Sequence, residues 1–292
     1  MHRIAPCAPY LPRRASDTNK YDYGRVLIVG GCIGYTGAPT LCARAALRCG
    51  AGLVSVGVPE AIYAVTAVKN DEAMPFPLPS AEGKLARDAL PVLLERLEKS
   101  DVCVLGPGLG RNDTLTALVQ AVVMQSGTPL VLDADALFAV AQDAAVLERA
   151  RAPIVLTPHD GEFARLAGPD KTGRAEAASD FAVRHGCTVV RKGPETVCAF
   201  PDGDAAVPIL PSGTAARLCA RDRRRSARSR TGTRRCCVLA IPAWPRAAAA
   251  TCWRACSLRC CARCPRATRC RPPSGCTAGR AISAPGAWAN MR

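Results

Sequence analysis

Short apolar and β-branched runs alternate with longer, alanine-rich segments over the first 210 residues of the chain. Short apolar runs bounded by glycine or polar clusters predict buried strands, whereas apolar residues three and four positions apart predict helices. We predict strands over Arg25–Val29, Leu53–Gly57, Asp101–Leu105, Pro129–Leu132, Pro153–Leu156 and Thr188–Arg191. We predict helices over Ala38–Cys49, Leu85–Leu97, Thr114–Met124 and Ala175–His185. Such alternation is typical of an α/β fold with a central, mostly parallel sheet and helices on both faces.

Nearly every predicted strand ends in a glycine-rich or polar segment. These segments are GGCIGYTGA at 30–38, GPGLG at 106–110, DADAL at 133–137, TPHDGE at 157–162 and KGPET at 192–196. In open α/β sheets, ligands bind where the carboxyl ends of the strands meet the N-termini of helices. We therefore expect these segments to line one cleft.

The two glycine-rich segments suit a close approach of the backbone to a ligand. The glycines at 30, 31, 34 and 37 follow a strand and precede a helix, where backbone N–H groups and the helix dipole attract anions. Their spacing is not that of the G-x-G-x-x-G dinucleotide motif. Taken alone, the first segment is equally well explained as tight turns that need a positive φ, and GPGLG by itself is a turn.

Two aspartates stand where a predicted strand becomes a helix. Asp133 or Asp135 can cap that helix, while the other reaches the cleft or orders water around a divalent ion. His159 follows a buried strand, where a neutral imidazole can donate to a substrate oxygen; the alternative is a solvated loop histidine. Lys192 can meet phosphate oxygens as a point charge, with Thr196 adding a hydroxyl; the alternative is a surface lysine.

Taken in order, several of these strings resemble the ADP-dependent (S)-NAD(P)H-hydrate dehydratases. The strings are KYDYGRVLIVGG, GYTGAPTLCARAALRCGAGLVSVGVPE, GPGLG, LVLDADAL, VLTPHDGEFARLAG and TVVRKGPETVCAFPDG. The resemblance runs from about Leu11 to Gly203. It implies a ribokinase-like fold and a repair enzyme that uses ADP, with Mg²⁺, to phosphorylate the hydroxyl group of hydrated NADH or NADPH. Loss of phosphate then regenerates the cofactor.

The resemblance also implies site residues. It assigns three contacts with the hydrated dinucleotide, Ala38, Gly108 and His159. It assigns the adenine nucleotide to one segment, Lys192, Gly193, Pro194, Glu195 and Thr196. The family's later GNPG…GGSGD segment, whose glycines form an anion hole and whose Asp is the catalytic base, is absent from the printed chain. No catalytic residue and no metal ligand are therefore assigned.

Composition changes abruptly near residue 211. From 211 to 292 the chain holds 18 Arg, 10 Cys and a single acidic residue, Asp222, with no Lys or Glu. The first 210 residues hold 21 Lys and Arg against 23 Asp and Glu, a balance of −2, so the positive formal net charge of +15 comes entirely from the tail. We predict a short extension at 1–10, an incomplete dehydratase domain at 11–210, and a tail at 211–292 that is not natively folded.

An Arg- and Cys-rich tail without Lys or Glu is what GC-rich coding DNA gives when it is read out of frame. Shifting the degenerate codons of 240–256 by one base permits GNPGLATGGSGDVLAG, with Trp244 and Trp253 restricting the choices. The same shift turns 274–283 into VWVHGRAGDL and gives 284–292 the ending LGEYA. We hypothesise a frameshift between about Gly203 and Leu239; the segment from Thr214 to Arg235 has no explanation.

The remaining sequence features narrow the class of protein. No apolar run approaches the roughly 20 residues that span a bilayer, and prolines and arginines interrupt the N-terminus, so we expect a cytoplasmic protein without membrane contact. The basic stretch at 221–230 lacks aromatic residues for stacking bases, so we expect no nucleic-acid partner. Cys261-x-x-Cys264 has no second pair to complete a zinc site. We interpret the seven cysteines before residue 211 as small hydrophobic residues.

Three functions stay open at this point. The resemblance favours ADP-dependent dehydration of (S)-NAD(P)H hydrate with release of AMP and phosphate, impaired in the printed chain. A small-molecule kinase acting on a vitamin precursor shares the fold. A catalytically dead nucleotide-binding protein would bind ADP or AMP without turnover. A homo-oligomer is compatible with all three.

Overall fold

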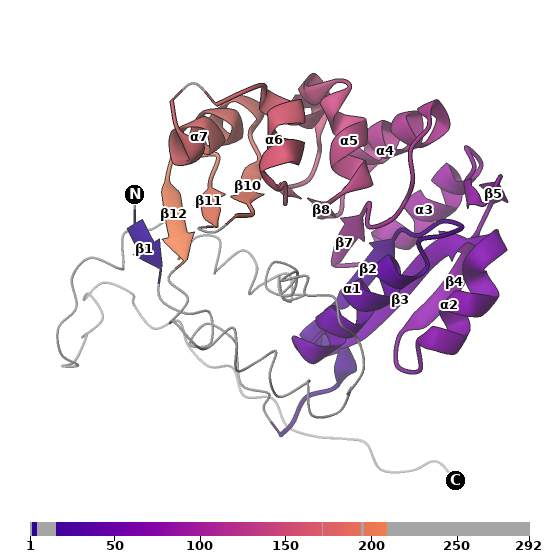
Figure 1. Ribbon diagram of the computed structural model, residues 1–292. Helices are drawn as coiled ribbons and strands as arrows, with labels where there is room; N and C mark the ends of the chain where they lie inside the picture. The colour runs from indigo at the N-terminus through magenta and orange to yellow at the C-terminus, as the bar shows by residue number, and fades with distance from the viewer. Residues whose placement is uncertain (1, 5–15, 171, 194–195, 209–292) are drawn as a thin grey trace, which may run out of the picture.

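The computed structural model describes residues 2–4, 16–170, 172–193 and 196–208, which form an α/β fold (Figure 1). The predicted tail at 211–292 lies outside the described residues, as does most of the predicted extension at 1–10. Ten strands of the described part make one sheet. In spatial order they are β1 (His2–Ile4), β12 (Ala205–Pro208), β11 (Val197–Ala199), β10 (Thr188–Arg191), β9 (Ile154–Leu156), β8 (Leu130–Leu132), β7 (Val102–Leu105), β2 (Arg25–Val29), β3 (Leu53–Pro59) and β4 (Met74–Leu78).

The sheet is mostly parallel, as the sequence predicts. From β10 through β9, β8, β7 and β2 to β4, every neighbouring pair is parallel, whereas β11 runs antiparallel to both β10 and β12. Strand β2 pairs Val26 with Val54 of β3 and with Val102 of β7. Two short strands, β5 (Ser80–Ala81) and β6 (Lys84–Leu85), form a separate hairpin.

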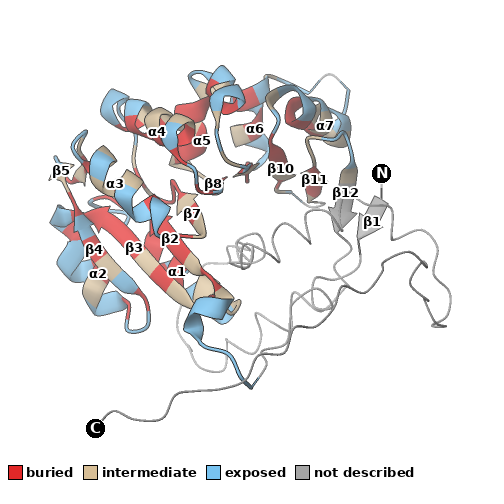
Figure 2. Cartoon of the chain, turned by 180° about the vertical axis from the view of Figure 1, so that it is seen from behind, coloured by how far each residue is buried: buried red, intermediate tan, exposed pale blue. Residues whose placement is uncertain are grey.

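Helices cover both faces of the sheet. They are α1 (Gly37–Arg48), α2 (Tyr63–Lys69), α3 (Ala89–Glu98), α4 (Asp113–Gln125), α5 (Asp135–Ala141), α6 (Asp160–Ala167) and α7 (Arg174–His185), with 3₁₀ turns at Lys20–Tyr23, Glu60–Ile62 and Ala144–Arg149. Successive side chains of a strand point to opposite faces. Val26 and Ile28 therefore join a core with α1, while Leu27 and Val29 join the larger core under α3 to α7. The buried strands lie between these layers (Figure 2).

The ends of the helices follow from local chemistry. The Asn112 side chain accepts the backbone N–H of Leu115 at 2.8 Å and so caps α4. Gly186, in the left-handed conformation at φ 62°, ends α7 where the sequence predicts its end. The prediction of a helix from Leu85 to Leu97 is wrong at its start, because Leu85 is a buried residue of β6 and a turn separates it from α3.

Strand β4 was not predicted from the sequence. Its residues, MPFPL, include Pro75 and Pro77, and proline within an apolar run argues against a strand. Proline is tolerated at the edge of a sheet, where its missing N–H faces away from the neighbouring strand. Among the strands that the structure describes, β4 occupies such an edge, beside β3 alone.

Most cysteines of the described residues are buried, as the sequence analysis expects. Cys32, Cys42, Cys103 and Cys187 are buried, whereas Cys49 and Cys198 are half-buried. Burial raises the pKa of the Cys42 and Cys187 thiols to about 12. These thiols are therefore protonated and unreactive at neutral pH. Separately, no helix in the described part of the chain is long and apolar enough to cross a membrane.

Candidate functional site

The glycine-rich and polar segments follow five strands that are neighbours in the sheet, β2, β7, β8, β9 and β10. They meet at its carboxyl edge. The Gly31 N–H donates to the carbonyl of Pro107 at 2.9 Å, which joins the segment after β2 to the one after β7. A Cβ placed on Gly30 would overlap that same carbonyl oxygen. Gly30 therefore has to be a glycine for these two segments to touch.

A second contact joins the segment after β7 to the one after β8. Gly106 has a φ of 120°, and a Cβ placed on it would overlap the carbonyl oxygen of Asp133. The next residue, Ala134, has a φ of 52°, which is rare for a residue with a side chain. Gly106 thus lies directly against a strained turn that orients Asp133.

Neither aspartate caps α5, so that interpretation of Asp133 and Asp135 is wrong. The helix has Ala134 at its N-cap position and no side-chain cap. Asp135 instead accepts the Gly110 N–H at 2.9 Å and Arg111 Nε at 2.8 Å. Both oxygens of its carboxylate thus bind the end of the GPGLG segment rather than the N–H groups of α5.

Asp133 reaches across to the two strands beyond it. Its Oδ1 accepts the Thr157 hydroxyl at 2.8 Å and the Lys192 ammonium at 2.7 Å. Lys192 Nζ also lies 3.9 Å from Oε2 of Glu162. Asp133, Glu162 and Lys192 are all largely shielded from solvent, with side-chain exposures of 16%, 13% and 27%. The ammonium predicted to meet phosphate is therefore paired with carboxylates.

His159 begins α6 and caps it. Its Nδ1 accepts the N–H groups of Gly161 and Glu162 at 3.0 and 3.2 Å, while Glu162 accepts the His159 N–H at 2.8 Å. Because Nδ1 is an acceptor, the neutral ring carries its proton on Nε2. Nε2 lies 3.3 Å from Glu162 Oε1, and the His159 side chain is half-exposed. The N–H that the sequence expects to donate to a substrate is thus at Nε2.

Ala38 and Gly108 lie side by side. A Cβ placed on Gly108 would lie 3.1 Å from the Cβ of Ala38 and 3.0 Å from the Cβ of Tyr35. Gly108 has a φ of 68°, so both its conformation and its neighbours favour glycine. The structure brings these two predicted dinucleotide contacts together at the junction of α1 with the segment after β7.

Lys192 is held next to His159 through the backbone. The two residues form an isolated parallel bridge, and the Lys192 N–H donates to the Pro158 carbonyl at 2.7 Å. Gly193 is exposed and Thr196 is half-buried just before β11. The other two residues predicted to hold the nucleotide, Pro194 and Glu195, lie outside the described residues.

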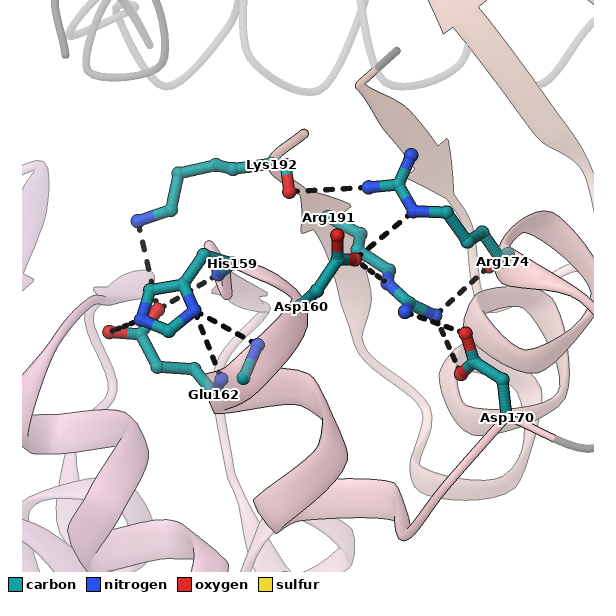
Figure 3. A network of polar contacts seen from close by, with 8 residues as sticks. His159, Asp160, Glu162, Asp170, Arg174, Arg191 and Lys192 are labelled. Carbon is teal, nitrogen blue, oxygen red and sulfur yellow. Dashed lines mark hydrogen bonds and ion pairs between the residues drawn. The ribbon is translucent and has the colours of Figure 1, made fainter. Parts of the chain in front are cut away.

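Sequence analysis missed a network of arginines and aspartates beside this backbone (Figure 3). Arg191 is almost fully buried and binds Asp170 through two bonds of 2.8 and 2.7 Å. Its Nε also donates to Asp160 Oδ1 at 2.8 Å, and Arg174 Nε donates to the same oxygen at 3.0 Å. Partial burial would raise the pKa of Asp160, but the bonds from Arg191 and Arg174 outweigh it and hold the pKa below its usual range.

A magnesium ion that enters with a nucleotide would fit the carboxylates near Lys192. No group of three or more His, Cys, Asp and Glu side chains is placed to hold a metal among the described residues. Mg²⁺ in nucleotide sites is usually bound by one or two carboxylates, with phosphate oxygens and waters completing its shell. Asp133 and Glu162 supply two such carboxylates.

A family model described as NAD(P)H-hydrate dehydratase matches residues 26–220, which include all five segments of the carboxyl edge. The chain belongs to this family. The match covers every residue predicted to contact the dinucleotide or the nucleotide. The ribokinase-like fold that the sequence resemblance implies is confirmed by similar proteins of solved structure.

Relatives in sequence carry names consistent with the family. A bifunctional NAD(P)H-hydrate repair enzyme of Moorella thermoacetica is 46% identical over 71% of this chain and 40% of its own length. An ADP-dependent (S)-NAD(P)H-hydrate dehydratase of Xanthomonas campestris is 36% identical over 66% of each chain. The present chain therefore spans about two fifths of the length of the bifunctional relatives it matches.

Solved structures agree on the fold. A ribokinase-like superfamily protein of Enterococcus faecalis superposes with a TM-score of 0.58 at 25% identity, covering 68% of this chain and 67% of that one. An ADP/ATP-dependent NAD(P)H-hydrate dehydratase of Bacillus subtilis, crystallised with ATP and Mg²⁺, gives a TM-score of 0.53 at 28% identity, covering 68% of each chain. Both similarities agree with the central, mostly parallel sheet of this chain.

Proposed function

We propose that this chain carries an ADP-dependent (S)-NAD(P)H-hydrate dehydratase domain at residues 11–210. In the proposed reaction the hydroxyl group of hydrated NADH or NADPH takes the terminal phosphoryl group of ADP, and AMP leaves. The phosphate ester then eliminates phosphate and regenerates the reduced nicotinamide. The observation that carries the proposal is the continuous row of contacts along the carboxyl edge, from Gly31 through Asp133 to Lys192, within the family match.

Each predicted residue that the structure describes has a role in this proposal that its position supports. Ala38 and Gly108 leave room for the dinucleotide to approach the backbone closely, because neither carries a long side chain. The Nε2–H of His159 donates to an oxygen of the dinucleotide. Lys192, together with Gly193 to Thr196, holds the phosphates of ADP, and Lys192 exchanges part of its pairing with Asp133 for phosphate oxygens.

Magnesium, when bound, would neutralise charge on the transferring phosphoryl group. Asp133 and Glu162 would accept hydrogen bonds from its water ligands or bind it directly. We also propose a cytoplasmic location, where NADH and NADPH turn over. The buried thiols of Cys42, Cys103 and Cys187 support a reducing compartment. We propose no partner beyond the two nucleotides and leave a homo-oligomer open.

The printed chain lacks one required group. Transfer to the hydroxyl needs an acceptor for its proton, and the family's GGSGD aspartate is absent from the printed sequence. This absence favours a second candidate function for the printed chain, the binding of ADP or AMP without turnover. The hypothesised frameshift connects the two candidates, since correcting it would restore both the base and the anion hole.

The direct test is to incubate the full chain with (S)-NADH hydrate, ADP and Mg²⁺ and to follow the absorbance of the reduced nicotinamide. The same assay is run on a chain whose codons from residue 240 onward are read in the shifted frame. We expect strong turnover from the shifted chain and weak or no turnover from the printed one, with ADP binding to both. Absence of turnover in both, or phosphorylation of a vitamin precursor without dehydration, would refute the dehydratase assignment.

Sequencing the DNA across the codons for residues 195–245 tests the frameshift. A corrected base that restores GGSGD would give an intact dehydratase. A confirmed printed sequence would leave a chain that retains at most a nucleotide site.

A further inference from the structure

We propose that Arg174 is a positioning residue that fixes the backbone of Lys192 and Gly193, and that Gly193 lacks a side chain in order to admit its guanidinium. Arg174 is the first residue of α7 and carries no role implied by the family resemblance. Because Lys192 and Gly193 belong to the segment assigned to ADP, the functional part of this role rests on the proposed function.

The backbone of Lys192 is held at both its N–H and its carbonyl group. Its N–H donates to the carbonyl of Pro158 at 2.7 Å, and its carbonyl accepts Nη2 of Arg174 at 3.2 Å. The first bond ties the segment to the loop between β9 and α6. The second ties it to α7 (Figure 3). A backbone fixed from two sides keeps the ammonium of Lys192 at the carboxylate of Asp133.

The guanidinium of Arg174 is itself held in place. Its Nε donates to Asp160 Oδ1 at 3.0 Å, and that oxygen also accepts Arg191 Nε at 2.8 Å. Arg191 is anchored by its two bonds to Asp170 and by the Phe163 ring, whose centroid lies 4.4 Å from its guanidinium carbon. Hydrogen bonds between ionised groups are stronger than neutral ones and fix direction. Arg174 therefore meets Lys192 as a rigid donor.

Gly193 and Arg174 occupy the same space. A Cβ placed on Gly193 would overlap Nη2 of Arg174 and lie 2.8 Å from its Cζ and 3.0 Å from its Nη1. Gly193 has no positive φ, so its backbone does not require glycine. Position 193 needs a glycine for a steric reason, because the Arg174 guanidinium occupies the place of a side chain. An added methyl group is relieved most easily by moving the end of the Arg174 side chain, and that movement breaks its bond to the Lys192 carbonyl.

The two residues are therefore coupled, and a double-mutant cycle tests the coupling. Arg174→Ala removes the donor, and Gly193→Ala displaces it. We expect each variant to speed hydrogen exchange of the Lys192 amide about tenfold and to weaken ADP binding about tenfold, as for loss of one charged hydrogen bond. The double variant should show no larger effect on amide exchange or ADP affinity than either single variant, because the same bond is lost only once.

The experiment uses the full chain, with hydrogen exchange measured without ligand and ADP binding measured by calorimetry. Arg165→Ala, at an exposed arginine of α6, and Gly127→Ala, at a glycine with no atom within 4 Å of its added Cβ, are the matched controls and should leave both measurements unchanged. Arg174→Lys, which keeps the charge but not the fork of donors, should rescue the exchange rate only in part.

The outcomes separate this role from the proposed function. Unchanged exchange at Lys192 in Arg174→Ala, or full additivity of the two single changes, overturns the positioning role whatever ADP does. Faster exchange in both single variants, without further change in the double variant, supports it. If the unaltered chain fails to bind ADP while these exchange results hold, the positioning role stands and the assignment of the segment to ADP is refuted.

Discussion

Gly106 is the point at which a single methyl group should do most harm to the site. In Gly106→Ala the new Cβ would overlap the Asp133 carbonyl and lie 2.6 Å from the Cβ of Ala136. The φ of 120° is itself unfavourable for alanine, at a cost of about 1–3 kcal/mol. Overpacking in a rigid surrounding costs about 1–3 kcal/mol more. We expect a total loss of roughly 2–6 kcal/mol in the free energy of unfolding.

The assay is urea denaturation followed by circular dichroism, with Gly127→Ala as the control. Gly127 has no positive φ and no neighbour within 4 Å of an added Cβ, so alanine there should stabilise by up to about 1 kcal/mol. Gly106→Ala should also weaken ADP binding, since relief of the overlap moves Asp133 away from Lys192. A Gly106→Ala chain within about 0.5 kcal/mol of the unaltered protein, with unchanged ADP affinity, would show that the contact between these segments is not rigid.

Three further outcomes are expected. Cys42 and Cys187, whose burial raises the thiol pKa to about 12, should resist alkylation in the native chain at mildly alkaline pH and react fully in urea; equal rates by mass spectrometry would contradict their burial. Asp160 has a lowered folded pKa, so its contribution to stability is present above its unfolded pKa and is lost as pH falls through the folded value. The unaltered chain should therefore lose more stability than Asp160→Asn between about pH 5 and pH 2, and parallel curves from denaturation at each pH would refute this. Asn112→Ala should cost about 1 kcal/mol by removing the cap of α4, whereas Asn112→Asp should retain the cap; an equal loss in both variants would argue against capping.

The sequence predicts the parts of the fold that depend on local patterns. The strands Arg25–Val29 and Thr188–Arg191 have the bounds that were predicted, because both are short apolar runs flanked by polar or glycine residues. The proline-containing strand β4 was missed, since only its place at the edge of the sheet makes Pro75 and Pro77 acceptable. That place is set by pairing with β3, which no local pattern reports.

The sequence predicts which residues form the site better than it predicts the contacts between them. The sequence indicates that His159 and Lys192 follow strands whose ends line one cleft, and the structure joins the two residues. It does not indicate that Asp133 pairs with Lys192, because the two residues are far apart in the chain. The buried Arg191 was also missed, since an arginine in a strand gives no sign of the two aspartates that neutralise it.

The prolines of β4 also bear on how the protein behaves at high concentration. Consecutive residues of a strand direct their N–H groups to opposite sides, so Pro75 and Pro77, two positions apart in an edge strand paired with β3, belong to the same side. The outer side of β4 therefore lacks two successive hydrogen-bond donors. A strand from a second molecule would find no continuous ladder there, so this edge resists the strand-to-strand aggregation that threatens exposed sheet edges.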